Sequence, residues 1–180
     1  GLPIELFLRD GELHLRPVRE ILSLRKKRLL YLEDVSLEQA NEYLDRVACS
    51  CVYMKIVGDG EQLLVETQDG EKKKTVSYDR SSCRLGVMDQ DGRKTGKYRG
   101  EEDQVTIGEE PISVEYFLDH SMIEVYLNER KSVTLRNYGN GDGRKIRLEG
   151  KTEKIRQLEV WEMESAYRLE ESLEGSTEHE

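Results

Sequence analysis

Two acidic side chains in the second half of the sequence, Asp119 and Glu124, have the chemistry that glycoside hydrolysis uses. That reaction needs two carboxyl groups, one protonated and one ionised, on either side of the scissile bond. The two residues are separated by a turn-like DHS sequence, which favours opposite faces of the chain. We therefore predict that Asp119 caps the turn, because aspartate accepts hydrogen bonds from nearby backbone N–H groups. Glu124 alternates with apolar neighbours and is expected to point outward or into an interface.

Asp119, His120 and Ser121 also have the residue types of a Ser-His-Asp hydrolase. Three consecutive residues cannot place nucleophile, base and orienting acid in one hydrogen-bonded line, so this triad is rejected. The sequence contains no GxSxG, GxxxxGKS/T or GxGxxG motif. The glycine-rich stretch 139–143 is expected to form a hairpin loop, because no helical pattern follows it. The sequence therefore predicts no catalytic residue and no cofactor.

Metal binding is not expected from the cysteines and histidines either. The cysteines form no CxxC pair and no spacing typical of zinc sites, and the histidines are scattered. In a strand, Cys49 and Cys51 would lie on one face about 7 Å apart, too far for an unstrained disulfide. These features predict a reducing, cytoplasmic setting. The cysteines are Cys49, Cys51 and Cys83, and the histidines are His14, His120 and His179.

The distribution of charge argues against some partners. The chain has 28 basic and 37 acidic side chains, a formal net charge of -9. Seven acidic residues and one basic residue lie between Glu162 and Glu180, so this end carries -6 and the remainder only -3. A body without a basic surplus is not expected to bind nucleic acid. No apolar run reaches 18 residues, so neither a membrane span nor a signal peptide is expected.

The pattern of apolar residues predicts strands. Apolar and polar side chains alternate over 112–118 and 123–127, as in strands with one buried face. Turn signals such as Asp-Gly recur about every ten residues. Many short strands at this spacing predict an all-β fold, a two-sheet antiparallel β-sandwich. The expected strands cover 4–8, 12–16, 49–57, 62–67, 73–78, 83–88, 104–107, 112–118, 122–127, 131–138, 145–149 and 154–163.

Three regions are expected along the chain. Residues 1–30 would form an entry hairpin and a linker, in which 19–30 connects the hairpin to the main sheets. Residues 31–165 would form the sandwich, with one helix over 37–44 capped by Ser36. Residues 166–180 would form an acidic, disordered tail, because they contain too few large apolar side chains to offset the entropy of ordering them.

Exposed aromatic side chains are the remaining signal for binding. Tyrosine supplies nine of the twelve aromatic residues. Tyr126 lies beside Glu124 on the face opposite the apolar residues of its strand, where it could form a platform for a sugar ring. Tyrosine is also common at sheet and domain interfaces, because it combines an apolar ring with a polar hydroxyl. Packing is the favoured interpretation of Tyr126.

One stretch of the sequence resembles a known family. LDHSMIEVYLN at 118–128 and SVTLRNY at 132–138 resemble the D-x-S-x-x-E-V-F-x-N and T-x-R-x-Y motifs near the end of glycoside hydrolase family 32 proteins. These proteins are the β-fructosidases: invertases, sucrose-6-phosphate hydrolases, levanases and inulinases. Tyr126 stands where phenylalanine is usual. The matching positions are Asp119, Ser121, Glu124, Asn128, Arg136 and Tyr138.

Two further stretches resemble the same family in the same order. Residues 3–6 and 13–25 are similar to the segment that enters its C-terminal domain, with matches at Pro17, Glu20 and Arg25. Ile4 replaces the usual arginine there, and Leu15-Arg16 replaces the usual glutamine approach to the proline. VSYDR at 76–80 is similar to the mid-domain I-x-Y-D-R motif. Its matching positions are Tyr78, Asp79 and Arg80.

The resemblance implies a β-sandwich like those of concanavalin and the legume lectins, packed beside a five-bladed catalytic propeller. In the family, the catalytic carboxylates lie in N-D-P, R-D-P and E-C motifs of that propeller. All three motifs are absent here, because each proline follows Leu, Arg or Glu and each cysteine follows Ala or Ser. No catalytic residue can be carried over, and the matching positions are predicted to be structural.

The chain is therefore expected to be the non-catalytic C-terminal sandwich of a β-fructofuranosidase-like enzyme. It would stabilise the catalytic propeller of the same parent chain and contribute to subunit contacts or the rim of the substrate cleft. The parent would hydrolyse O-glycosidic bonds of sucrose or fructans by retaining double displacement. Two alternatives remain open: a free carbohydrate-binding module for a fructan or sucrose-type sugar, and a homodimerisation domain without sugar affinity.

Overall fold

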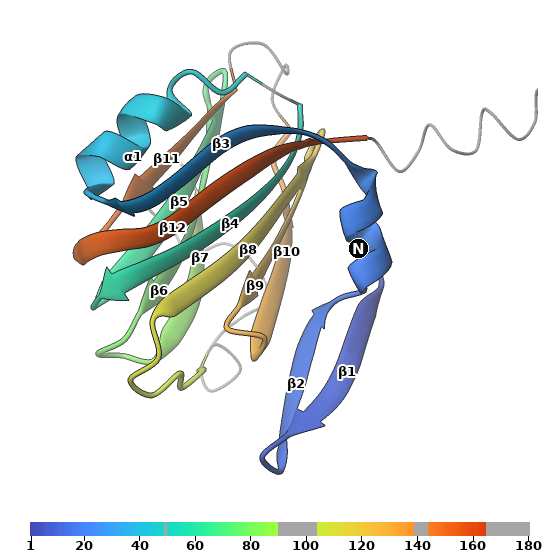
Figure 1. The fold of residues 1–180 in the computed structure, drawn as a ribbon, viewed down its shortest axis with the longest axis vertical. Coiled ribbons are helices and arrows are strands. Elements are labelled where there is room, and N and C mark those ends of the chain that lie inside the picture. Colours follow the sequence, from blue (N-terminus) through green and yellow to red (C-terminus); the bar gives the residue numbers. More distant parts are fainter. Residues whose placement is uncertain (49, 90–103, 139–143, 165–180) are drawn as a thin grey trace, which may run out of the picture.

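A computed structural model of the chain describes residues 1–48, 50–89, 104–138 and 144–164. Two antiparallel sheets pack face to face, so the predicted all-β sandwich is confirmed (Figure 1). The predicted tail over 166–180, the glycine-rich loop over 139–143 and Cys49 lie outside the described residues.

The larger sheet has six strands in the order β10-β9-β8-β4-β12-β3, and the smaller has four in the order β11-β5-β6-β7. Every neighbouring pair is antiparallel. The strand β12 lies between β3 and β4 although it is the last of the three in the sequence. The strands are β3 (Arg25–Val35), β4 (Cys51–Gly60), β5 (Gln62–Asp69), β6 (Lys72–Asp79), β7 (Arg84–Asp89), β8 (Ile112–Asp119), β9 (Met122–Leu127), β10 (Lys131–Arg136), β11 (Lys145–Glu149) and β12 (Thr152–Met163).

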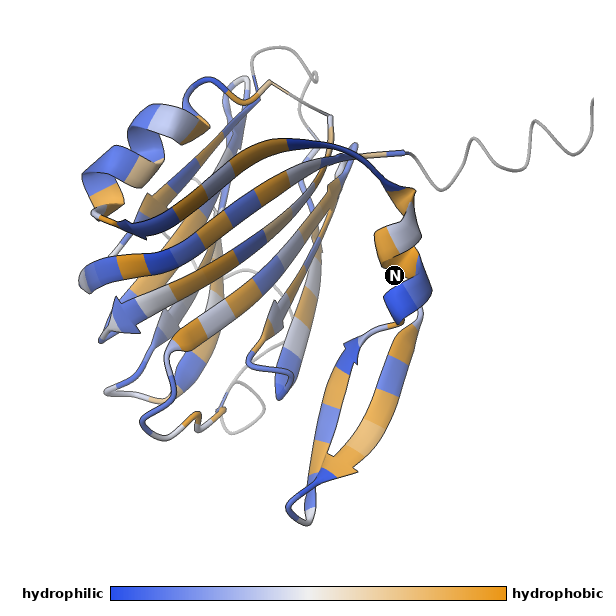
Figure 2. Ribbon diagram, viewed as in Figure 1, coloured by the Kyte–Doolittle hydropathy of each residue, from blue (hydrophilic) through white to orange (hydrophobic). Residues whose placement is uncertain are grey.

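The core fills the space between the sheets because alternate residues of each strand point inward. The large sheet contributes side chains such as Met54, Tyr116 and Val125, and the small sheet contributes side chains such as Val65 and Tyr78; all are at most 4% exposed. The alternation of apolar and polar residues is visible along most strands (Figure 2). The side chains of this core come from both sheets of the chain.

Two predicted segments differ from the structure. Residues 25–30 were expected to connect elements, but they form the first half of the edge strand β3, after a 3-10 helix η1 (Arg19–Leu24). The basic run is accommodated because the edge strand exposes Lys26, Lys27 and Arg28 to solvent, while Arg25 is half-buried. No strand forms over 104–107, where only Gln104 makes an isolated bridge. Val105 and Ile107 lie in a loop and are buried, which explains why the segment has the apolar alternation of a strand.

The predicted helix is confirmed as α1 (Leu37–Leu44). Ser36 Oγ accepts from Gln39 N–H at 3.1 Å while the Gln39 side chain accepts from Ser36 N–H at 3.0 Å, a complete capping box. The helix covers the edge of β11. Asn41 binds both backbone groups of Leu148, donating to its carbonyl and accepting from its N–H at 2.8 Å each. One buried amide thus takes the place of a neighbouring strand.

The N-terminal region stands outside the two sheets. The strands β1 (Ile4–Arg9) and β2 (Glu12–Pro17) form a hairpin. It lies on the opposite side of the sandwich from α1 and extends beyond the sheets (Figure 1). Asp10 and Gly11, with φ of 53° and 80°, form its left-handed turn. The helix η1 joins the hairpin to β3. Neither α1 nor η1 is long and apolar enough to span a membrane, and the described residues contain no other helix.

Replacing Asn41 with alanine should destabilise the sandwich. Asn41→Ala leaves a buried N–H and a buried carbonyl of Leu148 without partners, so the free energy of unfolding should fall by about 2–4 kcal/mol. Urea unfolding followed by circular dichroism measures this change. Glu42→Ala, on the exposed side of the same helix, is the control and should change stability by less than about 0.5 kcal/mol. Equal effects of the two substitutions would contradict the proposed role of Asn41.

Candidate functional site

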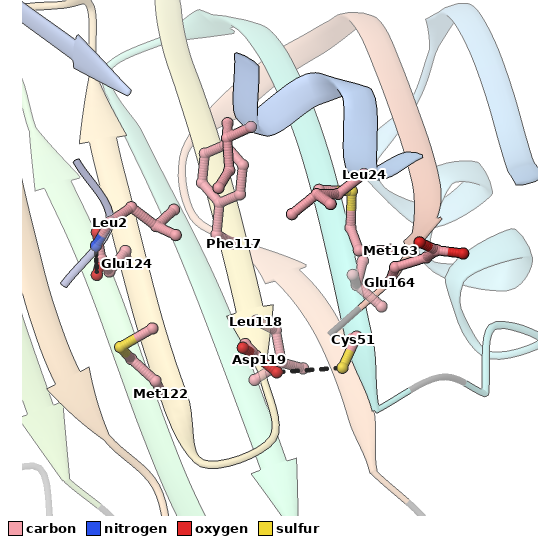
Figure 3. A pocket seen from close by; sticks show the side chains of 12 residues that line it. Leu2, Leu24, Cys51, Phe117, Leu118, Asp119, Met122, Glu124, Met163 and Glu164 are labelled. Atoms are coloured by element: carbon pink, nitrogen blue, oxygen red, sulfur yellow. Dashed lines mark hydrogen bonds between the residues drawn. The ribbon is translucent and has the colours of Figure 1, made fainter. Parts of the chain in front are cut away.

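The two carboxylates singled out in the sequence lie on the same face of the large sheet. The β8–β9 hairpin has a two-residue turn, so Asp119 pairs with Met122 and Phe117 pairs with Glu124. Directly paired residues of antiparallel strands point to the same side. The prediction that Asp119 and Glu124 occupy opposite faces is therefore wrong, because it did not include the register of the hairpin. Both side chains line one pocket on the outer face of the sheet (Figure 3).

Glu124 is buried at this face although it points away from the core. It is 3% exposed and accepts hydrogen bonds from the Leu2 backbone N–H at 2.5 Å and the Tyr126 hydroxyl at 2.9 Å. Figure 3 shows Leu2 directly over the Glu124 carboxylate. Of the two predicted environments, outward or in an interface, the structure gives the second. The interface is formed by the N-terminal segment of the same chain.

A second, smaller core surrounds this carboxylate. Tyr53, Phe117 and Tyr126 form an aromatic cluster on the outer face, with ring centroids 4.9 Å and 6.0 Å apart. Side chains from the N-terminal region and from the end of β12 cover the cluster. The preference for packing over sugar binding at Tyr126 is supported, because this residue is 2% exposed. The covering residues are Leu2, Leu15, Ile21, Leu22, Trp161 and Met163.

The pocket between these layers is too small for a sugar. Its cavity volume is about 30 Å³, whereas small-molecule sites occupy roughly 300–1,000 Å³. A space of this size holds about one water molecule. Among the described residues, Asp119 and Glu124 therefore do not flank a cleft that could admit a glycoside.

A larger, more polar cleft lies between the hairpin tip and the large sheet. Its volume is about 270 Å³, and Arg9, Lys55, Glu115 and Glu129 are among its lining residues. Burial raises the pKa of Glu115, and the nearby Lys55 ammonium opposes that rise. The Tyr53 hydroxyl donates to Glu115 at 3.4 Å. Two of the lining residues, Arg9 and Glu129, form an ion pair at 2.7 Å.

Asp119 contacts its two neighbours at the end of the sheet. Its Oδ1 atom lies 2.7 Å from His120 Nδ1 and 3.2 Å from Cys51 Sγ, and Cys51 Sγ lies 3.6 Å from the same His120 nitrogen. A Cys-His-Asp relay needs the thiol and the carboxylate on opposite nitrogens of the ring, so this arrangement is not a catalytic triad. Burial and the Asp119 carboxylate also raise the pKa of the Cys51 thiol to about 11, opposite to what an activated nucleophile requires.

The sequence did not indicate this grouping. Among the described residues, these three side chains form a group that could hold a metal ion, with donor atoms within 4.8 Å of one another. Cys51 and His120 are 69 positions apart in the sequence, and the pairing of Cys51 with Asp119 across β4 and β8 brings them together. Only the strand order could have revealed the cluster. These contacts involve side chains only, so the role of Asp119 as a cap of backbone N–H groups stays a prediction.

The mid-domain motif binds the segment 105–110 to the small sheet. Arg80 donates to three backbone carbonyls, those of Gly60, Gly108 and Glu110. Asp79 accepts from Ser81 Oγ at 2.6 Å and from the backbone and hydroxyl of Ser82, and these bonds lower its pKa. Tyr78, 2% exposed, donates to the Val105 carbonyl at 3.0 Å. The three positions hold backbone rather than a ligand.

The remaining motif positions fall in turns and at the start of β3. Asn128, with φ of 46°, accepts from Ser113 N–H and donates to the Pro111 carbonyl, which joins the β9–β10 turn to the start of β8. Ser121 accepts from Arg136 at 3.2 Å. Arg25 lies 4.7 Å from the Trp161 ring centre and donates to the Leu22 carbonyl.

Three other positions make fewer contacts. Pro17 is buried at the end of β2, Glu20 is exposed in η1, and Tyr138 is 72% exposed. The motif residues are therefore spread over several places, and the structure does not bring them together into one site.

The comparison with known families identifies the domain. Residues 52–162 match the model described as the C-terminal region of glycosyl hydrolases family 32. This match covers more than half of the chain. The chain belongs to this family. The resemblance inferred from the short motifs is confirmed, and the family 32 domain coincides with β4 to β12.

Solved structures agree on the fold of this family 32 domain. A sucrose-6-phosphate hydrolase from Lactobacillus gasseri matches with 20% identity and a TM-score of 0.58, covering 89% of this chain and 33% of that one. A β-fructofuranosidase from Bombyx mori matches with 19% identity and a TM-score of 0.60, over 92% and 33%. A fructan 1-exohydrolase from Cichorium intybus matches with 15% identity and a TM-score of 0.58, over 92% and 41%.

The chain is much shorter than the enzymes it matches. It spans between a third and two fifths of their length. A search of curated protein sequences found no match.

Removing the Glu124 carboxylate should loosen the N-terminal segment. Glu124→Ala leaves the Leu2 N–H and the Tyr126 hydroxyl without their acceptor at a buried position, so stability should fall by about 1–3 kcal/mol. Hydrogen exchange of the β1–β2 amides should become faster in the same variant. Thr134→Ala, at the exposed position paired with Glu124, is the control. Unchanged exchange in the hairpin would show that Glu124 does not anchor it.

Glu115 should make stability depend on pH. Its folded pKa is raised, so between the unfolded value of about 4.3 and the higher folded value the native state binds more protons. Stability from this group therefore falls as pH rises through that window. Glu115→Gln, which keeps an acceptor for Tyr53, should be more stable than wild type above the window and equal to it below about pH 4. Urea midpoints of both proteins across this range test the prediction, and a constant difference at all pH values would contradict it.

Proposed function

We propose that this chain is the non-catalytic β-sandwich of a β-fructofuranosidase-like enzyme, and that its hairpin docks on the catalytic domain and stabilises it. The observation that carries the proposal is the apolar face of the hairpin. Four large apolar side chains there are 48–74% exposed while the base of the hairpin is fixed to the sandwich. Figure 2 shows in orange that apolar residues are frequent along β1 and β2. The four residues are Ile4, Leu6, Leu8 and Leu13.

The pairing of the hairpin explains why these residues gather. Leu6 pairs with Leu15 and Leu8 pairs with Leu13, so apolar side chains of both strands share one side. On the other side Phe7 stacks on His14 and lies under Arg16, at 5.5 Å and 4.5 Å between centres. A two-stranded hairpin is marginal by itself and needs a further strand or a packing surface. An apolar face of this kind fits a docking surface better than a solvent-exposed one.

The absence of the catalytic sequence motifs and the short span of this chain relative to the three solved enzymes support the same proposal. In the family that this sequence resembles, the nucleophile, the acid and the stabilising aspartate all lie in the propeller. The parent enzyme would act on sucrose or fructans, and this chain would hold the propeller in shape. Contributions to the rim of the substrate cleft or to subunit contacts are part of the same proposal.

The carbohydrate-binding alternative has less support. The exposed aromatic residues among the described part of the chain are Tyr31, Tyr43 and Tyr138, which lie in β3, in α1 and after β10. A row of aromatic rings for stacking on sugars would need several of them on one face. Titration with inulin, levan and sucrose separates the alternatives: the docking proposal expects no heat of binding, and a saturable signal would favour the sugar-binding module.

Charged substitutions on the hairpin test the docking proposal directly. The double variant Leu6→Asp, Leu8→Asp should leave the stability of the 180-residue chain nearly unchanged, because both side chains are already exposed. In the full-length natural gene product the same variant should lower the melting temperature and speed thermal inactivation. Tyr43→Asp, an exposed site on α1 far from the hairpin, is the control (Figure 1). Equal melting temperatures of the double variant and the wild-type full-length product would overturn the proposal.

The mass of the natural gene product tests its premise. A propeller of five blades at ~40–50 residues each adds at least about 200 residues. Intact-protein mass spectrometry should therefore give a product well above about 40 kDa. A product near the 20.9 kDa of this chain would mean that the sandwich acts alone.

A further inference from the structure

The cluster of Cys51, Asp119 and His120 plays no part in the docking proposed above. It lies at the end of the large sheet, at the edge of the small pocket in Figure 3. Cys51 is the first residue of β4 and Asp119 the last of β8, so their register fixes the distance between the two side chains. His120 follows in the turn with φ of 52°, and its N–H donates to the Ser50 carbonyl at 3.0 Å. The backbone of all three residues is therefore held by the sheet.

The spacing of the donor atoms is close to that of a tetrahedral site. Zinc bonds of about 2.3 Å to sulfur, 2.0–2.1 Å to nitrogen and 2.0–2.2 Å to oxygen place neighbouring ligand atoms roughly 3.4–3.6 Å apart. Cys51 Sγ and His120 Nδ1 are already 3.6 Å apart, and Cys51 Sγ and Asp119 Oδ1 are 3.2 Å apart. The Asp119 to His120 distance of 2.7 Å must open by less than about 1 Å to match. The exposed His120 ring, with 64% of its side chain in contact with solvent, has room for this movement.

The types of the donor atoms select the metal. A thiolate, an imidazole and a carboxylate together suit zinc, whereas calcium and magnesium prefer all-oxygen ligands. Three protein ligands leave a fourth position for water on the solvent side, where His120 is exposed. We propose that Cys51, Asp119 and His120 form a binding site for one Zn²⁺ ion. Binding releases the Cys51 thiol proton to solvent, and no redox change occurs.

The site would connect parts of the chain that lie far apart in the sequence. It would clamp the start of β4 to the β8–β9 turn, beside the pocket that Leu2 and Glu124 also line. A ligand that binds only the folded state stabilises it in proportion to the logarithm of its concentration over its dissociation constant. Zn²⁺ should therefore raise the melting temperature of the chain. This expectation does not depend on the proposed enzymatic role.

Calorimetric titration with Zn²⁺ tests the site in the 180-residue chain without a histidine tag. The experiment uses a Cys49→Ser, Cys83→Ser background, so that Cys51 is the only thiol. One ion should bind per chain. Cys51→Ser and His120→Ala should each weaken binding by at least the roughly 10–100-fold that loss of an outer-shell partner costs. Ser121→Ala, a neighbouring residue outside the cluster, is the matched control and should leave the affinity unchanged.

Co²⁺ identifies the ligand atoms in the same background. A sulfur-to-cobalt charge-transfer band should appear on titration and be absent in Cys51→Ser. His120→Ala keeps the proposal testable if Cys51→Ser fails to fold, because this side chain is largely exposed. Absence of Zn²⁺ binding, or equal affinity in the background protein and in His120→Ala, would overturn the site and leave the cluster as a set of hydrogen bonds.

Discussion

The large sheet buries side chains on both of its faces, and much of the remaining structure follows from this. Tyr53, Phe117 and Tyr126 point away from the sandwich core, yet each is at most 6% exposed. Burying a large apolar side chain contributes about 1.5–3 kcal/mol, so three of them represent about 5–9 kcal/mol. That range is comparable to the entire net stability of a domain. The helix η1 and the base of the hairpin are therefore part of the folded unit, although they lie outside the region that defines the family.

Polar side chains in several parts of the fold connect backbone segments. Glu124 accepts from the N-terminal backbone, Arg80 joins the end of β4 to the loop before β8, and Asn128 joins a turn to the neighbouring strand. In each case a charged or amide side chain satisfies backbone groups that the sheets leave without partners. Several motif residues of this family 32 domain can thus be explained by the backbone groups that they bind. A glutamate that the sequence alone presents as a candidate acid is, in the structure, an anchor.

The sequence predicted the fold well where local patterns control it. Alternation of apolar residues located most strands, and Ser36 marked the start of α1. It failed for 25–30, because the polarity of the residues need not alternate along an edge strand near solvent. It failed for 104–107, because a buried loop gave the same pattern as a strand. The candidate site was less accessible. The face on which Glu124 lies depends on a two-residue turn, and the meeting of Cys51 with His120 depends on which strands pair. Neither is a property of a short stretch of sequence.

The position of β12 has a consequence for the synthesis of the chain. This strand lies between β3 and β4, so β3 remains separate from the other four strands of the large sheet until residues 152–163 have been synthesised. The backbone edges of β3 and β4 that pair with β12 have no partner until a segment more than 90 residues further along the sequence is made. Closing such long loops is entropically costly and slows folding. The large sheet should therefore be completed only after residue 163 has been synthesised, and a chain ending before residue 152 would expose sheet edges prone to aggregation.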